Sequence, residues 1–213
     1  MRVLVFGDSI TQGFWDSRGG WAARLRAAYD EVRLKDPNLD APLLFNLGIC
    51  GETSEELCKR IEPEIVARRS HQGDSFAFVI ASGMNDTKIE DGAVRSSPEA
   101  YRQHVTEVIW ILRQHADVSK VLLVGLTPVD EARTAPTEWN PSVSLTNNRI
   151  REFDAVLREV ATQSGASYVP VFEEFQKQPN WRTLLLDGLH PSDAGHQLMF
   201  KLIQPALQKI LAT

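Results

Sequence analysis

Three residues near opposite ends of the chain have the types and spacing that ester hydrolysis by a serine nucleophile requires. Ser9 supplies a hydroxyl, His190 supplies a base, and Asp187, three residues before the histidine, supplies a carboxylate. The reaction needs a base within reach of the hydroxyl and a group that orients the base. The short Gly- and Pro-bounded loop can fold back so that Asp187 reaches Nδ1 of His190, which leaves Nε2 facing Ser9. Alternatively, Ser9 caps a strand-to-helix turn, and Asp187 with His190 caps the last helix.

Two further residues supply hydrogen-bond donors of the kind that stabilise a developing oxyanion. Gly51 lies in a predicted turn, where the absence of a Cβ lets a backbone N–H approach a ligand closely. Asn85 carries a side-chain NH₂ group. Together with the backbone N–H of Ser9, these groups predict an oxyanion hole with three donors. One such donor is typically worth about 3 to 4 kcal/mol in the transition state.

The elements that must hold these residues are short apolar runs, each followed by glycines and polar residues. Their near-continuous apolar character is typical of strands that are covered on both faces. The predicted strands are Val3–Phe6, Leu43–Leu47, Phe76–Ala81, Val121–Leu126 and Tyr168–Val171.

Helical patterns alternate with these strands. They are expected at Trp21–Tyr29, Thr53–Arg69 (with Pro63 as a kink or boundary), Pro98–His115, Leu145–Gln163 and Ser192–Leu211. The alternation predicts an α/β fold, in which a parallel sheet carries helices on both faces. Ligands bind such sheets at the carboxyl ends of the strands, which is where the candidate residues collect.

The bulk properties limit the functions that the chain could have. A length of 213 residues fits one domain, residues 1–213, and the net charge of -5 gives no electrostatic case for a nucleic-acid partner. Two cysteines are too few for a disulfide framework or a structural zinc site. No apolar run approaches the ~20 residues that cross a bilayer, and no leader is recognisable. We therefore expect a cytoplasmic protein without membrane insertion.

Four short blocks of the sequence resemble, in order, those that define the SGNH hydrolases, also called the GDSL family. The residues that match the family's Ser, Gly, Asn and His are Ser9 in Gly-Asp-Ser-Ile, Gly51, Asn85 in Gly-Met-Asn-Asp, and His190 in Asp-Gly-Leu-His-Pro. Ile10 replaces the leucine of the family name, and Gly48 and Cys50 stand where many members carry serine. The resemblance implies a three-layer α/β/α, flavodoxin-like fold with a five-stranded parallel sheet of strand order 2-1-3-4-5. It also implies ester or thioester hydrolysis without a metal or cofactor.

These observations predict a serine esterase that cleaves carboxylic esters of small or short-chain acyl groups through an acyl-enzyme intermediate. Phe14, Trp15 and Trp139, the last in the irregular stretch Val129–Ser144, are candidates for the substrate pocket. Within the same family, a carbohydrate acetylesterase, a lysophospholipase or a thioesterase is the alternative. A non-catalytic flavodoxin-like ligand-binding module is the alternative of another class, although the chain has no Gly-Lys-Ser/Thr phosphate loop.

The remaining candidate residues have structural interpretations. Asp8 is expected to shape the turn around Ser9, and Asp86 is expected to be structural. Cys50 is expected to be a small buried residue. Of the other histidines, His196 is expected on the surface or in helix packing, and three are expected to be solvated, namely His71, His104 and His115.

Overall fold

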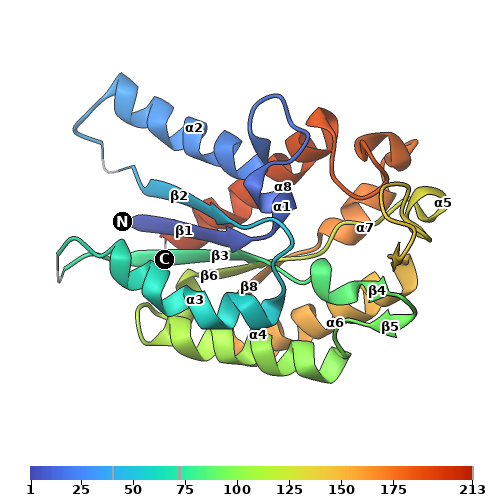
Figure 1. Ribbon diagram of the computed structural model, residues 1–213. Helices are drawn as coiled ribbons and strands as arrows, with labels where there is room; N and C mark the ends of the chain where they lie inside the picture. Colours follow the sequence, from blue (N-terminus) through green and yellow to red (C-terminus); the bar gives the residue numbers. More distant parts are fainter. Residues whose placement is uncertain (40, 72, 213) are drawn as a thin grey trace.

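The centre of the molecule is a five-stranded parallel sheet, seen in a computed structural model that describes residues 1–39, 41–71 and 73–212. The strand order is β2-β1-β3-β6-β8 (Figure 1). The strands are β1 (Arg2–Gly7), β2 (Leu43–Gly48), β3 (Phe76–Ala81), β6 (Val121–Val124) and β8 (Ser167–Val169). Since β6 and β8 are the fourth and fifth strands of this sheet along the chain, the predicted order 2-1-3-4-5 is confirmed.

Helices cover both faces of the sheet and give the predicted three layers (Figure 1). The pair α2 and α8 packs on one face, and α3, α4 and α6 pack side by side on the other. The helices are α1 (Ser9–Gln12), α2 (Gly20–Lys35), α3 (Ser54–Ala67), α4 (Pro98–Arg113), α5 (Glu131–Thr134), α6 (Asn147–Ser164), α7 (Val171–Gln176) and α8 (Asp193–Ala212). Short 3₁₀ turns form η1 (Asn85–Thr87), η2 (Val118–Lys120) and η3 (Trp181–Leu184).

The burial of the strands explains why their sequences are apolar runs. All four residues from Val3 to Phe6 are 0% exposed, because β1 lies in the middle of the sheet with helices on both faces. The edge strand β2 instead mixes exposed, half-buried and buried positions. The expected strand at 168–171 ends earlier, at Val169, and Val171 begins α7.

Local capping chemistry sets where several helices begin. Thr53 and Glu56 form a reciprocal capping box at the start of α3. Ser97 caps α4, and Pro98 occupies its first turn as expected. Pro63 was expected to mark a kink or a helix boundary, and the boundary was wrong, because α3 continues through this residue.

Two regions depart from the predicted pattern. A small antiparallel sheet of order β5-β4-β7 joins β4 (Ile89–Glu90), β5 (Ala93–Val94) and β7 (Val143–Ser144). The stretch 129–144, expected as an irregular loop, holds α5 and β7. Elements of two to four residues are too short to produce a recognisable hydrophobic period, which is why the sequence pattern missed them.

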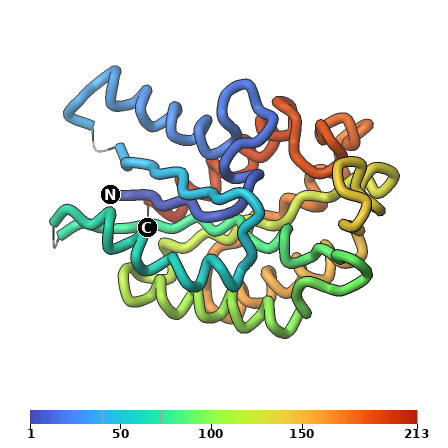
Figure 2. Tube along the Cα trace, in the orientation of Figure 1, coloured from blue at the N-terminus to red at the C-terminus, as the bar shows by residue number. Residues whose placement is uncertain are grey.

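The loops that follow the carboxyl ends of the central strands gather at one end of the sheet (Figure 2). In that view they lie on the right, where the blue, green, yellow and red parts of the chain meet. Within the described residues, we find no helix with the length and apolar character to cross a membrane.

Candidate active site

A chain of hydrogen bonds links one hydroxyl, one imidazole and one carboxylate at this end of the sheet. Ser9 Oγ lies 2.9 Å from Nε2 of His190, and Nδ1 of His190 lies 2.7 Å from Oδ2 of Asp187. The structure therefore brings together the three side chains that the sequence analysis singled out. With the Nδ1 proton donated to Asp187, Nε2 is left as the acceptor for the Ser9 hydroxyl.

A tight turn between β1 and α1 holds Ser9 at the first position of a helix. Oδ1 of Asp8 accepts a hydrogen bond from the backbone N–H of Ile10 at 2.9 Å, which caps α1. Gly13 ends this four-residue helix with a left-handed φ of 99°. The expectation that Asp8 shapes the turn is confirmed. Asp8 is only 3% exposed, and burial raises its pKa to about 6.

The loop that carries His190 wraps around the carboxylate of Asp187. Oδ1 of Asp187 accepts the backbone N–H groups of Leu189 and His190 at 3.0 and 2.7 Å. Oδ2 accepts Nε1–H of Trp15 at 3.0 Å as well as the imidazole. Burial raises the pKa of Asp187, but the hydrogen bonds and charge of His190 outweigh burial and hold this pKa well below its ordinary value. The carboxylate is therefore fixed in its charged form beside the imidazole.

The candidate oxyanion donors also line this site. Gly51 has a left-handed φ of 79° in the loop after β2. Among the described residues, the backbone N–H groups of Ser9 and Gly51 donate to no acceptor. Nδ2 of Asn85 donates to the backbone oxygen of Glu52 at 3.0 Å and lies 3.4 Å from Oδ2 of Asp8.

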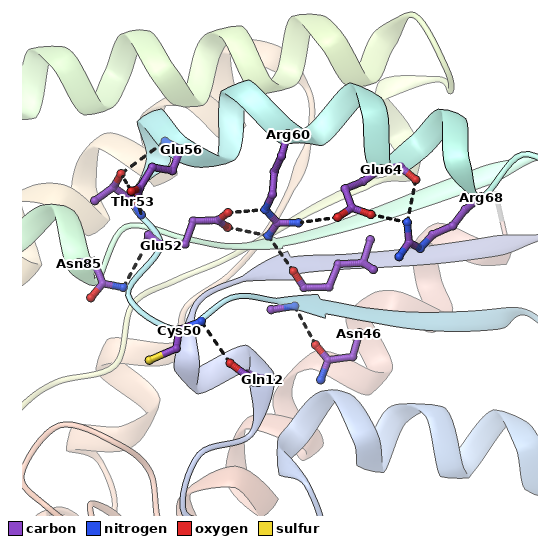
Figure 3. Close-up of polar contacts among 12 residues, drawn as sticks. Gln12, Asn46, Cys50, Glu52, Thr53, Glu56, Arg60, Glu64, Arg68 and Asn85 are labelled. Atoms are coloured by element: carbon purple, nitrogen blue, oxygen red, sulfur yellow. Dashed lines mark hydrogen bonds and ion pairs between the residues drawn. The ribbon is translucent and has the colours of Figure 1, made fainter.

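An ion-pair network that the sequence analysis missed clamps the loop containing Gly51 (Figure 3). Arg60 on α3 donates to both carboxylate oxygens of Glu52 and, through Nη2, to the backbone oxygen of Leu47 at 2.7 Å. Both ends of the loop are thus tied to one guanidinium. Arg60 also lies 3.8 Å from Glu64. Glu52 and Arg60 stand eight residues apart with no motif around them, so no sequence signal marks the pair.

The three hydrogen-bonded residues Ser9, His190 and Asp187 line a cavity of about 610 Å³. Three aromatic rings predicted for this pocket surround the imidazole of His190. Their centroids lie 5.8, 6.2 and 6.3 Å from its ring, for Phe14, Trp15 and Trp139 respectively. The lining residues that sequence reasoning missed are Lys88, Glu138, Leu186 and Leu189.

Cys50 is exposed and lines the cavity, so the expectation of a small buried residue was wrong. The backbone N–H of Cys50 donates to Oε1 of Gln12 at 3.1 Å, beyond the end of β2 (Figure 3). The loop therefore passes over α1 at the surface rather than through the core, which exposes the thiol.

The other histidines divide into two groups. His71 is exposed as expected, whereas His104 and His115 are half-buried, so the expectation of solvated side chains was wrong for these two. Nδ1 of His104, on α4, lies 2.9 Å from Oγ of Ser54, on α3, and Nδ1 of His115 lies 3.3 Å from Nη2 of Arg69. His196 is 0% exposed and contacts the backbone oxygen of Phe14 at 3.1 Å, so its role is in packing.

Asp86 accepts the backbone N–H of Ser54 at 2.9 Å and its hydroxyl at 2.5 Å, which confirms a structural position. Within residues 1–39, 41–71 and 73–212, no three His, Cys, Asp or Glu side chains are grouped so as to hold a metal ion.

A flavodoxin-like sheet with a serine–histidine–aspartate chain over its carboxyl edge defines a class of ester hydrolases. The chain belongs to the GDSL-like lipase/acylhydrolase family, whose model matches residues 5–198. The protein is therefore an ester hydrolase of this family, and the resemblance found in its sequence motifs is confirmed.

Individual relatives extend over almost the whole chain. The isoamyl acetate-hydrolyzing esterase 1 homolog of Homo sapiens is 26% identical over 219 residues, which cover 98% of this chain and 82% of the human protein. A lipase/acylhydrolase from Enterococcus faecalis superposes with a TM-score of 0.76 at 22% identity, covering 98% of this chain and 95% of that one. The acetylxylan esterase Axe2 from Geobacillus stearothermophilus has the same fold, with a TM-score of 0.70 at 19% identity and coverage of 97% and 93%.

Proposed function

We propose that the chain is a serine esterase that hydrolyses carboxylic esters of small or short-chain acyl groups, with Ser9 as the nucleophile. The observation that carries the proposal is the uninterrupted hydrogen-bond chain from Asp187 through His190 to Ser9, which ends in an open cavity. Because Ser9 and His190 come from opposite ends of the sequence, we further propose that residues 1–213 act as one catalytic domain.

Acylation begins with a proton transfer. Nε2 of His190 takes the hydroxyl proton of Ser9 as Oγ bonds to the ester carbonyl carbon, and the C=O electron pair moves onto the carbonyl oxygen. The carboxylate of Asp187 stabilises the imidazolium that forms, and its bonds to the 187–190 loop keep the imidazole in the required tautomer. The Asp187 carboxylate remains charged throughout the step.

Three donors then hold the oxyanion. Two of them are the backbone N–H groups of Ser9 and Gly51, which donate to no acceptor among the described residues. The side-chain amide of Asn85 supplies the third. Its Nδ2 donates one hydrogen to the backbone oxygen of Glu52 at 3.0 Å, and the other hydrogen faces Oδ2 of Asp8, which lies 3.4 Å from Nδ2. The oxyanion replaces this longer contact. Removal of one donor of this kind typically costs about 100- to 1000-fold in rate.

The intermediate collapses when the imidazolium of His190 gives its proton to the leaving alcohol oxygen and the carbon–oxygen bond breaks. The acyl group then remains on Ser9 Oγ. Water attacks the acyl carbon while His190 takes one of its protons, the bond from carbon to Oγ breaks, and His190 returns the proton to Oγ. The products are a carboxylic acid and an alcohol, and the enzyme regains its starting state.

Pocket size and composition support short substrates. A cavity of about 610 Å³ lies within the range typical of small-molecule sites. The rings of Phe14, Trp15 and Trp139 give it an apolar side next to His190. A relative named for hydrolysing isoamyl acetate, a short acyl group on an apolar alcohol, supports the same preference.

Two measurements test the proposal. Intact-mass analysis after treatment with a sulfonyl fluoride should show one label per chain on Ser9, and none in a Ser9→Ala variant. Hydrolysis of a series of esters from acetate to long acyl chains should give its highest kcat/KM at the short end. Acetylated sugars and lysophospholipids belong in the same series. Absence of the label on Ser9 would overturn the nucleophile, and a maximum at long acyl chains or at lysophospholipids would overturn the preference for short acyl groups. A maximum at acetylated sugars would narrow the substrate class to carbohydrate acetates.

A further inference from the structure

Lys88 brings a positive charge to the wall of the catalytic cavity and forms no direct ion pair with a described residue. The residue lines the same cavity as Ser9 and His190 and is half-buried. Across the described part of the chain, its Nζ makes no hydrogen bond and no ion pair. A partly desolvated ammonium without a partner is costly, and an anionic group in the cavity would offset that cost.

The acidic residues that line the cavity are already paired. Asp187 is bonded to His190 and Trp15. Glu138 forms an ion pair with Arg133 at 2.9 Å. Lys88 is therefore the lining charge that remains available to a ligand. Burial lowers the pKa of Lys88, and the positive charge of Arg95 lowers it further, while the charge of Asp8 opposes both effects.

The backbone around Lys88 is held in place on both sides. Its own oxygen accepts the N–H of Arg95 at 2.9 Å. The preceding residue, Thr87, is 0% exposed, and its oxygen accepts Nε–H of Arg149 at 3.0 Å. The ammonium is thus presented from a fixed turn, and this turn also contains Asn85, one of the oxyanion donors.

We propose that Lys88 forms an anion subsite, and that the preferred substrates are half esters of short dicarboxylic acids, which carry a free carboxylate on the acyl side. This inference rests on the proposed function. His190 protonates the leaving alcohol, so the alcohol lies beside the aromatic rings that surround this imidazole. Lys88 instead follows directly after η1, the turn that begins at Asn85, and it lines the cavity on the side of this oxyanion donor, where we place the acyl group. An ammonium–carboxylate hydrogen bond is of the strong, charge-assisted kind.

The test compares monobenzyl succinate with benzyl 4-methylpentanoate, in which an isopropyl group replaces the carboxylate at similar shape. We expect wild-type protein to have the higher kcat/KM for the charged ester. Lys88→Met should lower the ratio of the two kcat/KM values by about 10- to 100-fold, the size expected for a hydrogen bond to a charged group. Lys177→Met is the matched control, since this exposed lysine does not line the cavity and pairs with Glu174. It removes the same charge and should leave the ratio unchanged.

Charge reversal sharpens the test. Lys88→Glu should favour benzyl 4-aminobutanoate, whose acyl group ends in an ammonium, over monobenzyl succinate. A ratio that does not depend on residue 88 would overturn the subsite even if both esters are hydrolysed through Ser9. A dependence on Lys88 for 4-acetoxybenzoate but not for monobenzyl succinate would place the anion on the alcohol side and overturn the half-ester assignment.

Binding separates this inference from the proposed function. Calorimetry with monobenzyl succinate and the Ser9→Ala protein measures the subsite without turnover, and adding Lys88→Met should weaken binding by about 10-fold or more. If no ester is hydrolysed but this loss is seen, the proposed function fails and the anion subsite stands. If esters are hydrolysed and binding does not change, the subsite fails and the proposed function stands.

Discussion

Within the described residues, two clusters of serine, histidine and aspartate lie at or beside the candidate active site, and they differ in the order of their hydrogen bonds. In the first, His190 stands between Ser9 and Asp187. In the second, Ser54 stands in the middle: its hydroxyl donates to Asp86 at 2.5 Å and lies 2.9 Å from Nδ1 of His104, on α4. Both serines are the first residue of a helix, α1 for Ser9 and α3 for Ser54. Residue types and helix position are therefore shared, while the order of the hydrogen bonds differs.

The order decides which proton can move. The Ser54 hydroxyl proton is committed to a carboxylate, so His104 can only donate to the same oxygen and cannot act as its base. Ser54 is 1% exposed, whereas Ser9 is 7% exposed and lines the large cavity. The second cluster instead joins two segments of the site, because Gly51 lies three residues before Ser54 and Asn85 directly precedes Asp86. We therefore propose that the first cluster contacts the substrate, whereas the second holds the two segments that carry the candidate oxyanion donors.

The largest expected contrast is between the activities of the alanine variants of the two serines. Ser9→Ala removes the nucleophile, and hydrolysis of a short-chain ester should fall by about 10⁴-fold or more, with the unfolding temperature nearly unchanged. Ser54→Ala should retain activity within about tenfold of wild type. Initial rates and thermal unfolding of both variants give the comparison. Equal losses of activity in the two variants would contradict the assignment of different roles to the two clusters.

The carboxylates provide the next contrast. Asp187→Asn leaves an amide opposite Nδ1 of His190, which favours the wrong tautomer, and kcat should fall by about 10³- to 10⁴-fold. Asp86→Asn affects no group that transfers a proton, so its kcat should fall by no more than about tenfold. Steady-state kinetics of both proteins at neutral pH measure the difference. A kcat of Asp187→Asn within tenfold of wild type would remove Asp187 from the proposed chemistry.

Ser54→Ala should show its main effect in stability. The substitution removes one of the two donors to the buried Asp86 and the partner of His104, which costs about 1 to 3 kcal/mol. Since Gly51 and Asn85 are then held less firmly, kcat should decline more than KM changes. Urea unfolding together with kcat and KM tests both parts. Ser164→Ala, at the end of α6 far from the site in sequence, provides a control for removing a hydroxyl.

A feature of this molecule could be predicted from the sequence where an apolar period or a short motif along the chain marks it. The five strands, the main helices and the residues Ser9, Gly51, Asn85, Asp187 and His190 were predictable, because apolar periods and short motifs mark the strands and their carboxyl ends. The Glu52–Arg60 pair and the Ser54–His104 contact depend on side chains that meet only after folding. Lys88 resembles any other lysine in the sequence, and its position in the cavity wall is a property of the tertiary structure.

The smallest expected effect is a difference between the two clusters in how their aspartates make the free energy of unfolding depend on pH. Burial raises the pKa of Asp86, and the hydrogen bonds with Ser54 and the charge of His104 offset this rise only in part. The pKa of Asp187 instead lies below its ordinary value, because the contacts with His190 outweigh the effect of burial. A lowered pKa in the folded state stabilises the fold above the ordinary value of 3.8, and this contribution is lost as the pH falls through the folded pKa. A raised pKa has the opposite consequence: its contribution is complete below 3.8 and is lost as the pH rises through the folded pKa.

The two asparagine variants should therefore diverge from wild type in opposite directions. The stability gap between wild type and Asp187→Asn should be largest near neutral pH and should shrink below about pH 4. The gap between wild type and Asp86→Asn should be largest below about pH 4 and should shrink toward neutral pH. Urea unfolding of the three proteins across this range measures both gaps. Parallel pH profiles for the two variants would mean that the carboxylates have the same environment, and the contrast between an ionised aspartate beside the nucleophile and a buried aspartate in the frame would fail.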